Sequence, residues 1–277
     1  MRIQLFSDLH LERDPTFRPF IHEDTDVVIV AGDVGSYQSG SRLGTDDFGL
    51  QRFSPLQPGF PCAVVLYVPG NHEFDSLDYD ETYARLRRTC AQLGITWLER
   101  EVVTIGQVRF VGTTLWSDFD ALASREPDAT KQMQLRTKAY RAANYYLSKN
   151  TTLRSGEPVL AEAIREMSLA CQAWLRAALA VPFEGATVVV THFAPSLLSA
   201  DPRYGLTAGT AGFCNAMDDL FPLADVWMHG HLHCFNDYVV KSPDDGQSWS
   251  CRVVANPLGY LSKGEQAWFR ENLVIEI

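Results

Sequence analysis

Five short apolar runs in the sequence each end in polar side chains. The runs are rich in β-branched residues, and they are RIQLFSD (2–8), DVVIVAGD (26–33), AVVLYVPGN (63–71), ATVVVTH (186–192) and DVWMHGH (225–231). Runs that are apolar on both faces predict the strands of a sheet that is buried between two layers. Ligands bind at the carboxyl ends of such strands in open α/β sheets. We therefore expect a functional site where these runs end.

Helical patterns and a second group of short strands complete the predicted α/β fold. Residues 78–93 begin with acidic residues and precede Gly94, which predicts a helix that ends at this glycine. Residues 158–180 carry apolar side chains at helical spacing, which predicts a second helix with Pro158 in its first turn. The second group of strands is ITWLE, EVVTI, VRFVGTT, CRVVAN and NLVIEI. Because no helix separates these neighbours, we expect antiparallel pairing and hence mixed sheets.

Two segments interrupt this pattern as insertions. Residues 34–61 are rich in Gly, Ser, Pro and Asp, which predicts a long loop or lid. Residues 116–157 are polar and helix-prone, which predicts a small helical cap. The sequence contains no internal repeat and no convincing linker. A length of 277 residues is by itself compatible with one large domain or two smaller ones.

Composition restricts the partners and the compartment. The formal net charge is −10, which argues against a long nucleic-acid duplex as the main partner. A small anionic substrate held by metal ions stays possible.

Asp8 and His10 interrupt the first apolar run, so no signal peptide is expected. No stretch approaches the roughly 20 apolar residues of a membrane span. Six cysteines without a C-x-x-C pair fit reduced thiols, and we expect a cytoplasmic protein that does not enter the membrane.

Histidines are concentrated at the ends of the predicted strands. The chain has seven histidines, and only His22 lies in an ordinary polar stretch. The other six are His10, His72, His192, His229, His231 and His233. A single histidine is more often a core or surface residue than a metal ligand, but six at strand ends, together with Asp8, Asp33 and Asn71, favour a metal site.

The local spacing of these residues supports that interpretation. Asp8-x-His10 and His231-x-His233 each place two potential ligands two residues apart, where side chains of an extended segment point the same way. Glycine precedes the ligand candidate in Gly32-Asp33, Gly70-Asn71 and Gly230-His231, which lets the backbone approach a metal closely.

The ordered motifs resemble those of the calcineurin-like metallophosphoesterase superfamily. They are DLH (8–10), GD (32–33), GNHE (70–73), TH (191–192) and GHLH (230–233). This resemblance implies a four-layer α/β/β/α sandwich with two mixed sheets and a dinuclear metal site at the strand ends. Because ligands between residues 8 and 233 must converge, we expect residues 1–277 to form a single domain that carries both insertions.

The resemblance also implies individual roles. Asp8, His10, Asp33 and His233 would hold one metal ion, and Asp33, Asn71, His192 and His231 the other. Asp33 would bridge the two ions, and His72 would be the general acid. Imidazole, carboxylate and amide ligands suit Mn, Fe, Zn or Ni better than Mg or Ca, and we favour Mn. The third motif ends in Glu73 where Asp is common, Leu258 stands where bacterial relatives often have Arg, and His229 is an additional histidine.

The predicted function is metal-dependent hydrolysis of a phosphate ester. A hydroxide that bridges the two metal ions would attack phosphorus, with His72 protonating the leaving group. The sequence leaves open a phosphomonoester or a small phosphodiester, possibly a nucleotide, and leaves the oligomeric state open. Arg42 and Arg203 are candidates for phosphate contacts or are solvated surface residues. The alternatives are a non-catalytic metal-binding interaction scaffold of the same fold and a structural metal protein.

Overall fold

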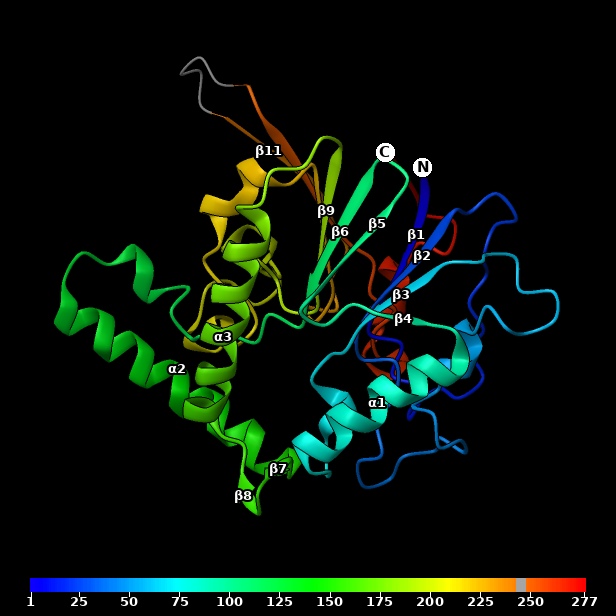
Figure 1. The fold of residues 1–277 in the computed structure, drawn as a ribbon. Helices are drawn as coiled ribbons and strands as arrows, with labels where there is room; N and C mark the ends of the chain where they lie inside the picture. The colour runs from blue at the N-terminus through cyan, green and yellow to red at the C-terminus, as the bar shows by residue number, and fades with distance from the viewer. Residues whose placement is uncertain (243–247) are drawn as a thin grey trace.

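Two β-sheets form the centre of the computed structural model, which describes residues 1–242 and 248–277. The first sheet has the strand order β13-β1-β2-β3-β4. Its strands are β1 (Arg2–Phe6), β2 (Val27–Ala31), β3 (Val65–Val68), β4 (Thr96–Trp97) and β13 (Val274–Glu276). Strands β1 to β4 are parallel, and β13 pairs antiparallel with β1. This last pairing places the two termini side by side (Figure 1).

The second sheet has the order β11-β12-β10-β9-β6-β5. Its strands are β5 (Glu101–Ile105), β6 (Val108–Thr113), β9 (Ala186–Thr191), β10 (Val226–His229), β11 (Asn236–Lys241) and β12 (Ser250–Ala255). The four central strands are parallel, and the edge strands β5 and β11 are antiparallel to their neighbours. Both sheets are therefore mixed, and the predicted α/β class with two mixed sheets is confirmed.

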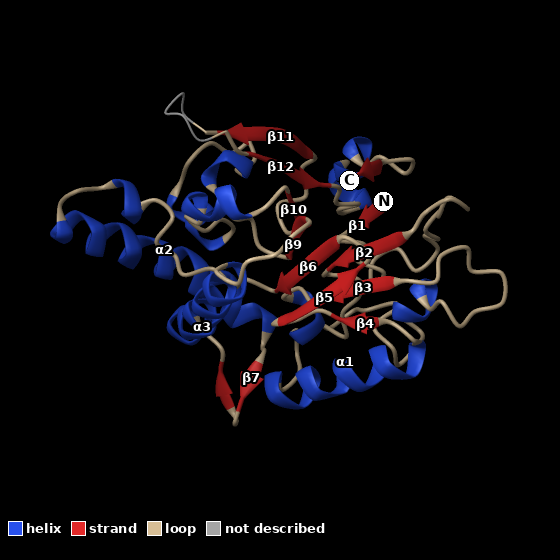
Figure 2. Cartoon of the chain, turned by 45° about the horizontal axis from the view of Figure 1, so that its top comes forward, coloured by secondary structure: helices blue, strands red, loops and turns tan. Residues whose placement is uncertain are grey.

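The alternation of side chains along the strands produces the layers. One set of aliphatic residues from both sheets packs together between them, including Ile3, Ile29, Val188 and Met228. The other face of each sheet packs against helices, and a second buried cluster there combines strand residues such as Trp227 with helix residues. Helix α1 (Tyr79–Leu93) lies against the first sheet and α3 (Ala161–Leu179) against the second (Figures 1 and 2).

Helix α1 begins and ends as its sequence predicts. The Asp78 carboxylate accepts hydrogen bonds from the backbone N–H groups of Asp80 and Glu81, which satisfies donors of the first turn. Gly94 ends the helix in the left-handed conformation with φ of 70°. Because α1 connects β3 to β4, the β4 strand runs parallel to β3, and the predicted antiparallel pairing of this segment is wrong.

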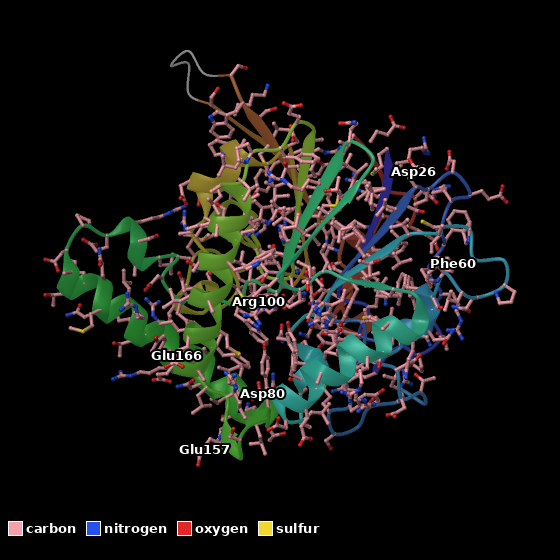
Figure 3. The ribbon with its side chains drawn as sticks, in the orientation of Figure 1. Asp26, Phe60, Asp80, Arg100, Glu157 and Glu166 are labelled. Atoms are coloured by element: carbon pink, nitrogen blue, oxygen red, sulfur yellow. The ribbon has the colours of Figure 1, made fainter. Side chains whose placement is uncertain are left out.

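The region between β6 and β9 contains helix α2 (Ala129–Asn150) and the hairpin of β7 (Leu153–Arg154) and β8 (Glu157–Pro158). Pro158 lies in the hairpin, so the prediction that it starts a helix is wrong, and α3 begins at Ala161. Arg154 pairs with Asp80 at 3.0 Å, which joins the hairpin to the start of α1 at one end of the molecule (Figure 3).

Short 3₁₀ helices occupy many of the connections. They are η1 (Leu50–Phe53), η2 (His72–Phe74), η3 (Ala123–Arg125), η4 (Leu197–Ser199), η5 (Ala208–Gly212), η6 (Asp218–Leu223), η7 (Leu261–Lys263) and η8 (Glu265–Trp268). Strand β11 was not predicted, because its alternating exposed and half-buried residues mark a solvated edge strand. Across residues 1–242 and 248–277, every helix is too short or too polar to cross a membrane.

Packing of α3 against the second sheet should contribute strongly to stability. Leu175 is fully buried in this helix, whereas Leu169 on the same helix is 44% exposed. We expect Leu175→Ala to lower the free energy of unfolding by about 2–5 kcal/mol, because it leaves a cavity. Leu169→Ala is the matched control and should change it by less than about 0.5 kcal/mol. Urea unfolding followed by circular dichroism measures both, and equal losses would contradict this packing.

Candidate metal centre

The polar residues that follow the parallel strands of both sheets meet in one place. Strands β1, β2 and β3 of the first sheet lead to Asp8, His10, Asp33, Asn71 and His72, and strands β9 and β10 of the second lead to His192, His231 and His233. Seven of these eight residues fall into overlapping groups whose ligand atoms lie within 4.8 Å of one another, and Asn71 contacts His192. The structure thus brings together all eight site residues predicted from the sequence.

The backbone turns sharply at these strand ends. Five of the site residues have φ between 47° and 72°, in the left-handed region: Asp8, His10, Asp33, His231 and His233. Non-glycine residues rarely adopt this conformation, and it is found preferentially at functional sites. Its effect here is to direct the side chains into a common space immediately after each strand.

Two glycines allow the close approach of the loops. A Cβ atom at Gly230 would lie 2.6 Å from Asp8 Oδ2, and one at Gly70 would overlap the Asp33 carboxylate. Any other residue at these positions would push the carboxylates away from the histidines. The glycines of the GNHE and GHLH motifs are therefore required by packing around the acidic side chains.

The first group of potential ligands consists of Asp8, His10 and His233. His10 Nε2 lies 2.9 Å from His233 Nε2, and His233 Nε2 lies 3.5 Å from Asp8 Oδ1. Asp8 and His10 are buried, and His233 is half-buried. Two imidazole nitrogens and a carboxylate oxygen thus face one another at the bottom of the site.

The second group consists of Asp33, His192 and His231, and Asn71 joins it. His192 Nε2 lies 3.3 Å from Asp33 Oδ2, 3.2 Å from Asn71 Oδ1 and 3.2 Å from His231 Nδ1. Asp33 also forms a group with His10 and His72, so its carboxylate lies between the two clusters.

Hydrogen bonds to Nδ1 orient three of these imidazoles. His10 Nδ1 lies 3.1 Å from Glu12 Oε1, His233 Nδ1 lies 2.7 Å from Glu265 Oε2, and His192 Nδ1 lies 2.8 Å from the Ala31 carbonyl oxygen. Each Nδ1 faces an acceptor and so carries a proton, and Nε2 is the nitrogen that would bind a metal once its own proton is lost.

This arrangement fits divalent cations. His10 Nε2 and His233 Nε2 lie 2.9 Å apart, so either a proton on one of them or a cation bound by both must separate their lone pairs. Asp33 Oδ2 is buried and has no hydrogen-bond partner. A buried carboxylate oxygen of this kind is normally paired with a charge or a metal ion. Imidazole and carboxylate are common ligands of Mn, Fe, Zn and Ni.

The electrostatic field of the site also attracts positive charge. Burial disfavours charged imidazoles, yet Asp33 raises the pKa of His192 to about 9 and hydrogen bonds to Asp8 and Glu265 raise the pKa of His233 to about 9. Burial and the neighbouring His192 lower the pKa of His231 well below its usual value. Protons and metal ions compete for such nitrogens, so cation binding would release protons.

His72 differs from the other histidines in its environment. Its Nδ1 lies 2.5 Å from the Asp75 carboxylate, and its side chain is 21% exposed whereas that of Asp75 is only 2% exposed. Burial opposes protonation of His72, but the charges of Asp75 and Asp33 raise its pKa to about 10. The ring is therefore held in place from behind while one edge faces the opening of the site.

Buried carboxylates support the site, and most of them were not identified from the sequence. Glu12, Asp75 and Glu265 each bond a site histidine from behind. Glu12 follows His10 by two residues, a spacing that could have revealed it. Glu265 is the first residue of η8, far from His233 in the sequence and outside the motifs, so only the tertiary structure identifies it.

Two further residues of the motifs have supporting positions. Glu73 accepts hydrogen bonds from the backbone N–H groups of Asp33, Val34 and Gly70, which ties the loops after β2 and β3 together. His229 is buried away from the ligand groups, where it bonds the Ser199 hydroxyl at 2.9 Å, and burial lowers its pKa to about 4.

A family model described as calcineurin-like phosphoesterase matches residues 1–235, which include every residue of the two ligand groups. The chain belongs to the calcineurin-like phosphoesterase family. Membership of the calcineurin-like phosphoesterases supports metal-dependent hydrolysis of phosphate esters and implies divalent metal ions.

Two known proteins are similar to this chain, one in sequence and one in structure. The chain is 21% identical over 231 residues to the uncharacterized protein L509 of Acanthamoeba polyphaga mimivirus, with 76% of each chain covered. It resembles the crystal structure of a phosphopantetheinyl hydrolase from Mycobacterium tuberculosis with a TM-score of 0.64 and 22% identity, over 94% of this chain and 90% of the other. At this identity the second likeness establishes the fold.

Proposed function

We propose that this chain hydrolyses a phosphomonoester or a small phosphodiester at a centre of two divalent cations. The observation that carries the proposal is the position of Asp33. Its buried Oδ2 atom has no hydrogen-bond partner, and its carboxylate belongs both to the group with His192 and His231 and to the group with His10. Metal-bridging carboxylates occupy such positions in two-metal hydrolases.

Each cation would have four protein ligands. Asp8, His10, Asp33 and His233 would hold one cation, and Asp33, Asn71, His192 and His231 would hold the other. The mixture of imidazole, carboxylate and amide groups is compatible with Mn, Fe, Zn or Ni, and we favour Mn. When bound, the two cations supply an activated water and charge stabilisation of the phosphoryl oxygens.

The charge of the ligands explains how an acidic protein would bind an anion. Asp8 and Asp33 are the only carboxylates among the proposed ligands, so two divalent cations would leave the centre positively charged. Bound cations are the largest local charges in such a site and outweigh the net charge of −10 carried by the whole chain.

His72 is proposed as the general acid. The Asp75 carboxylate fixes the Nδ1 side of its ring, so Nε2 is the atom that can give a proton to the leaving oxygen. Asp33 Oδ1 accepts a hydrogen bond from the His72 backbone N–H at 2.8 Å, which fixes the main chain beside the proposed ligands. The partly exposed edge of the ring makes it reachable by substrate.

The proposed class of substrate is a small phosphate ester, and it includes two candidates. A phosphopantetheinyl ester is one candidate, because the similar crystal structure is that of a phosphopantetheinyl hydrolase, and a nucleotide is another. Both are small phosphate esters. The alternative of a non-catalytic metal-binding scaffold shares the metal ligands but would show no turnover.

Activity in the presence of Mn²⁺ tests the proposal. We expect the chain to hydrolyse p-nitrophenyl phosphate, bis-p-nitrophenyl phosphate or both, and Asp33→Asn to abolish this activity because the shared ligand is lost. Asp24→Asn, at an exposed position, is the matched control and should keep full activity. Bound metal without turnover of either ester would favour the scaffold instead.

Replacement of His72 tests proton transfer. We expect His72→Ala to lower kcat/KM by about 10²–10⁴-fold for alkyl phosphates, whose leaving oxygen needs a proton. The loss should be much smaller for p-nitrophenyl phosphate, because nitrophenolate leaves without protonation. An equal loss on both substrates would exclude the role of general acid.

Glu265 should influence metal binding through His233. We expect Glu265→Gln to weaken Mn²⁺ binding by about 10–100-fold, since the charged acceptor that orients His233 is lost. Isothermal titration calorimetry measures this effect without a substrate. Glu271→Gln, exposed in the same C-terminal region, is the control, and equal affinity of the two variants would contradict the role of Glu265.

A further inference from the structure

The C-terminal segment forms one wall of the site. The Tyr260 ring stacks on the His10 ring with centroids 4.2 Å apart and lies 5.1 Å from the His233 ring. Tyr260 is half-buried, and it follows Gly259, where a Cβ atom would lie 2.6 Å from Glu265 Cβ. This segment lies beyond residues 1–235, which the family model covers.

A lysine lies on this wall. Lys263 Nζ is 4.7 Å from the centroid of the Tyr260 ring, and the Lys263 side chain is exposed. None of the carboxylates in the described part of the chain lies within 4 Å of it. The ammonium group is therefore a free cation one aromatic ring away from His10.

Two arginines lie at the turn that follows His10 and in the segment hydrogen-bonded to this turn. The Arg13 backbone N–H donates to the His10 carbonyl at 2.8 Å, and the Arg42 backbone N–H donates to the Glu12 carbonyl at 2.9 Å. Arg42 also donates from its side chain to the Arg13 carbonyl. The Arg13 side chain donates a hydrogen bond to Gln38 Oε1 at 3.3 Å. Burial and the charges of Glu12, Asp33 and Asp75 raise the pKa of Tyr260, and the charge of Arg13 acts against them.

These arginines also lack acidic partners. Both are exposed, and among residues 1–242 and 248–277 neither forms an ion pair. Asp14, in the same turn, is hydrogen-bonded to Thr16, and this bond together with the weaker effect of the Arg42 charge lowers the pKa of Asp14. We refer to Arg13, Arg42 and Lys263 as the basic rim.

Arg203, on another side of the centre, provides a contrast. It donates to the His233 carbonyl at 3.4 Å, but its guanidinium group is paired with the buried Asp201 at 2.6 Å. Its charge is therefore largely offset. Glu12 and Glu265 are buried and hydrogen-bonded to His10 and His233. Burial would raise the pKa of Glu265, but its bond to His233 and, to a smaller extent, the charge of Lys263 lower it.

The basic rim is unusual in a chain with a net charge of −10. The phosphoryl group that reacts is assigned to the metal centre itself, so charges beyond Tyr260 would meet a different part of the substrate. On the basis of the proposed function, we infer that the leaving group of the substrate carries a second anionic group, a carboxylate or a second phosphate. The basic rim binds this group and selects for it.

Two matched pairs of ligands test the inference. The first pair is 4-carboxybenzylphosphonate and its neutral isostere 4-carbamoylbenzylphosphonate, which cannot be hydrolysed. We expect Mn²⁺-loaded protein to bind the carboxylate form at least about fivefold more tightly in calorimetry. The ratio of the affinity for the carboxylate ligand to the affinity for the carbamoyl ligand should fall by about two- to fivefold in Lys263→Gln and in Arg13→Gln. Added salt should reduce this ratio further. The second pair is the corresponding aryl phosphates, compared by kcat/KM.

Lys149→Gln is the matched control for Lys263→Gln. Lys149 is also exposed and lies 3.8 Å from the centre of a tyrosine ring, Tyr145, but at the end of α2. The ratio should not change in this variant. The inference would be overturned if the two phosphonates bound equally or if neither bound. It would also be overturned if the affinity ratio were unchanged in Lys263→Gln. A binding preference without hydrolysis of the aryl phosphates would contradict the proposed function and leave the basic rim standing.

Discussion

The convergence of buried imidazole nitrogens on buried carboxylates is the interaction on which the site depends. Burying Asp8 and Asp33 removes their hydration, and this loss is large unless positive charge or hydrogen bonds replace it. Histidines that follow strands of the second sheet supply part of the replacement, because His192 lies 3.3 Å from Asp33 and His233 lies 3.5 Å from Asp8. The left-handed backbone of five residues that follow three strands is the conformational strain that this convergence requires.

The carboxylates behind the histidines give the site its rigidity. Glu12, Glu265 and Asp75 each hold the far side of one ring, and Glu73 links the loops after β2 and β3. Each ring is thus fixed in tautomer and in orientation before any ligand arrives. Preorganisation of this kind lowers the reorganisation needed during a reaction. It also explains why so many buried acidic groups are tolerated near one another.

Much of the fold and of the site was predictable from the sequence, for different reasons. Apolar runs with chemical groups at their ends identified β1, β2, β3, β9 and β10, because burial on both faces leaves a strong local signal. Strand β11 left no such signal, since one of its faces is solvated. Pro158 misled because a proline fits a hairpin as well as a first helical turn. The division into one domain with two insertions stays a prediction.

The sequence by itself determined the chemical groups of the site and their order. Motif glycines, aspartates and histidines are local features, and the requirement that they converge follows from their positions at strand ends. Only the tertiary structure decided which carboxylate supports which histidine and which aromatic ring lies beside His10. The C-terminal segment, which has no recognisable pattern, brings Glu265 into a hydrogen bond with His233 and Lys263 into contact with the Tyr260 ring. Such contacts join side chains through space, and neither periodicity nor spacing along the chain encodes them.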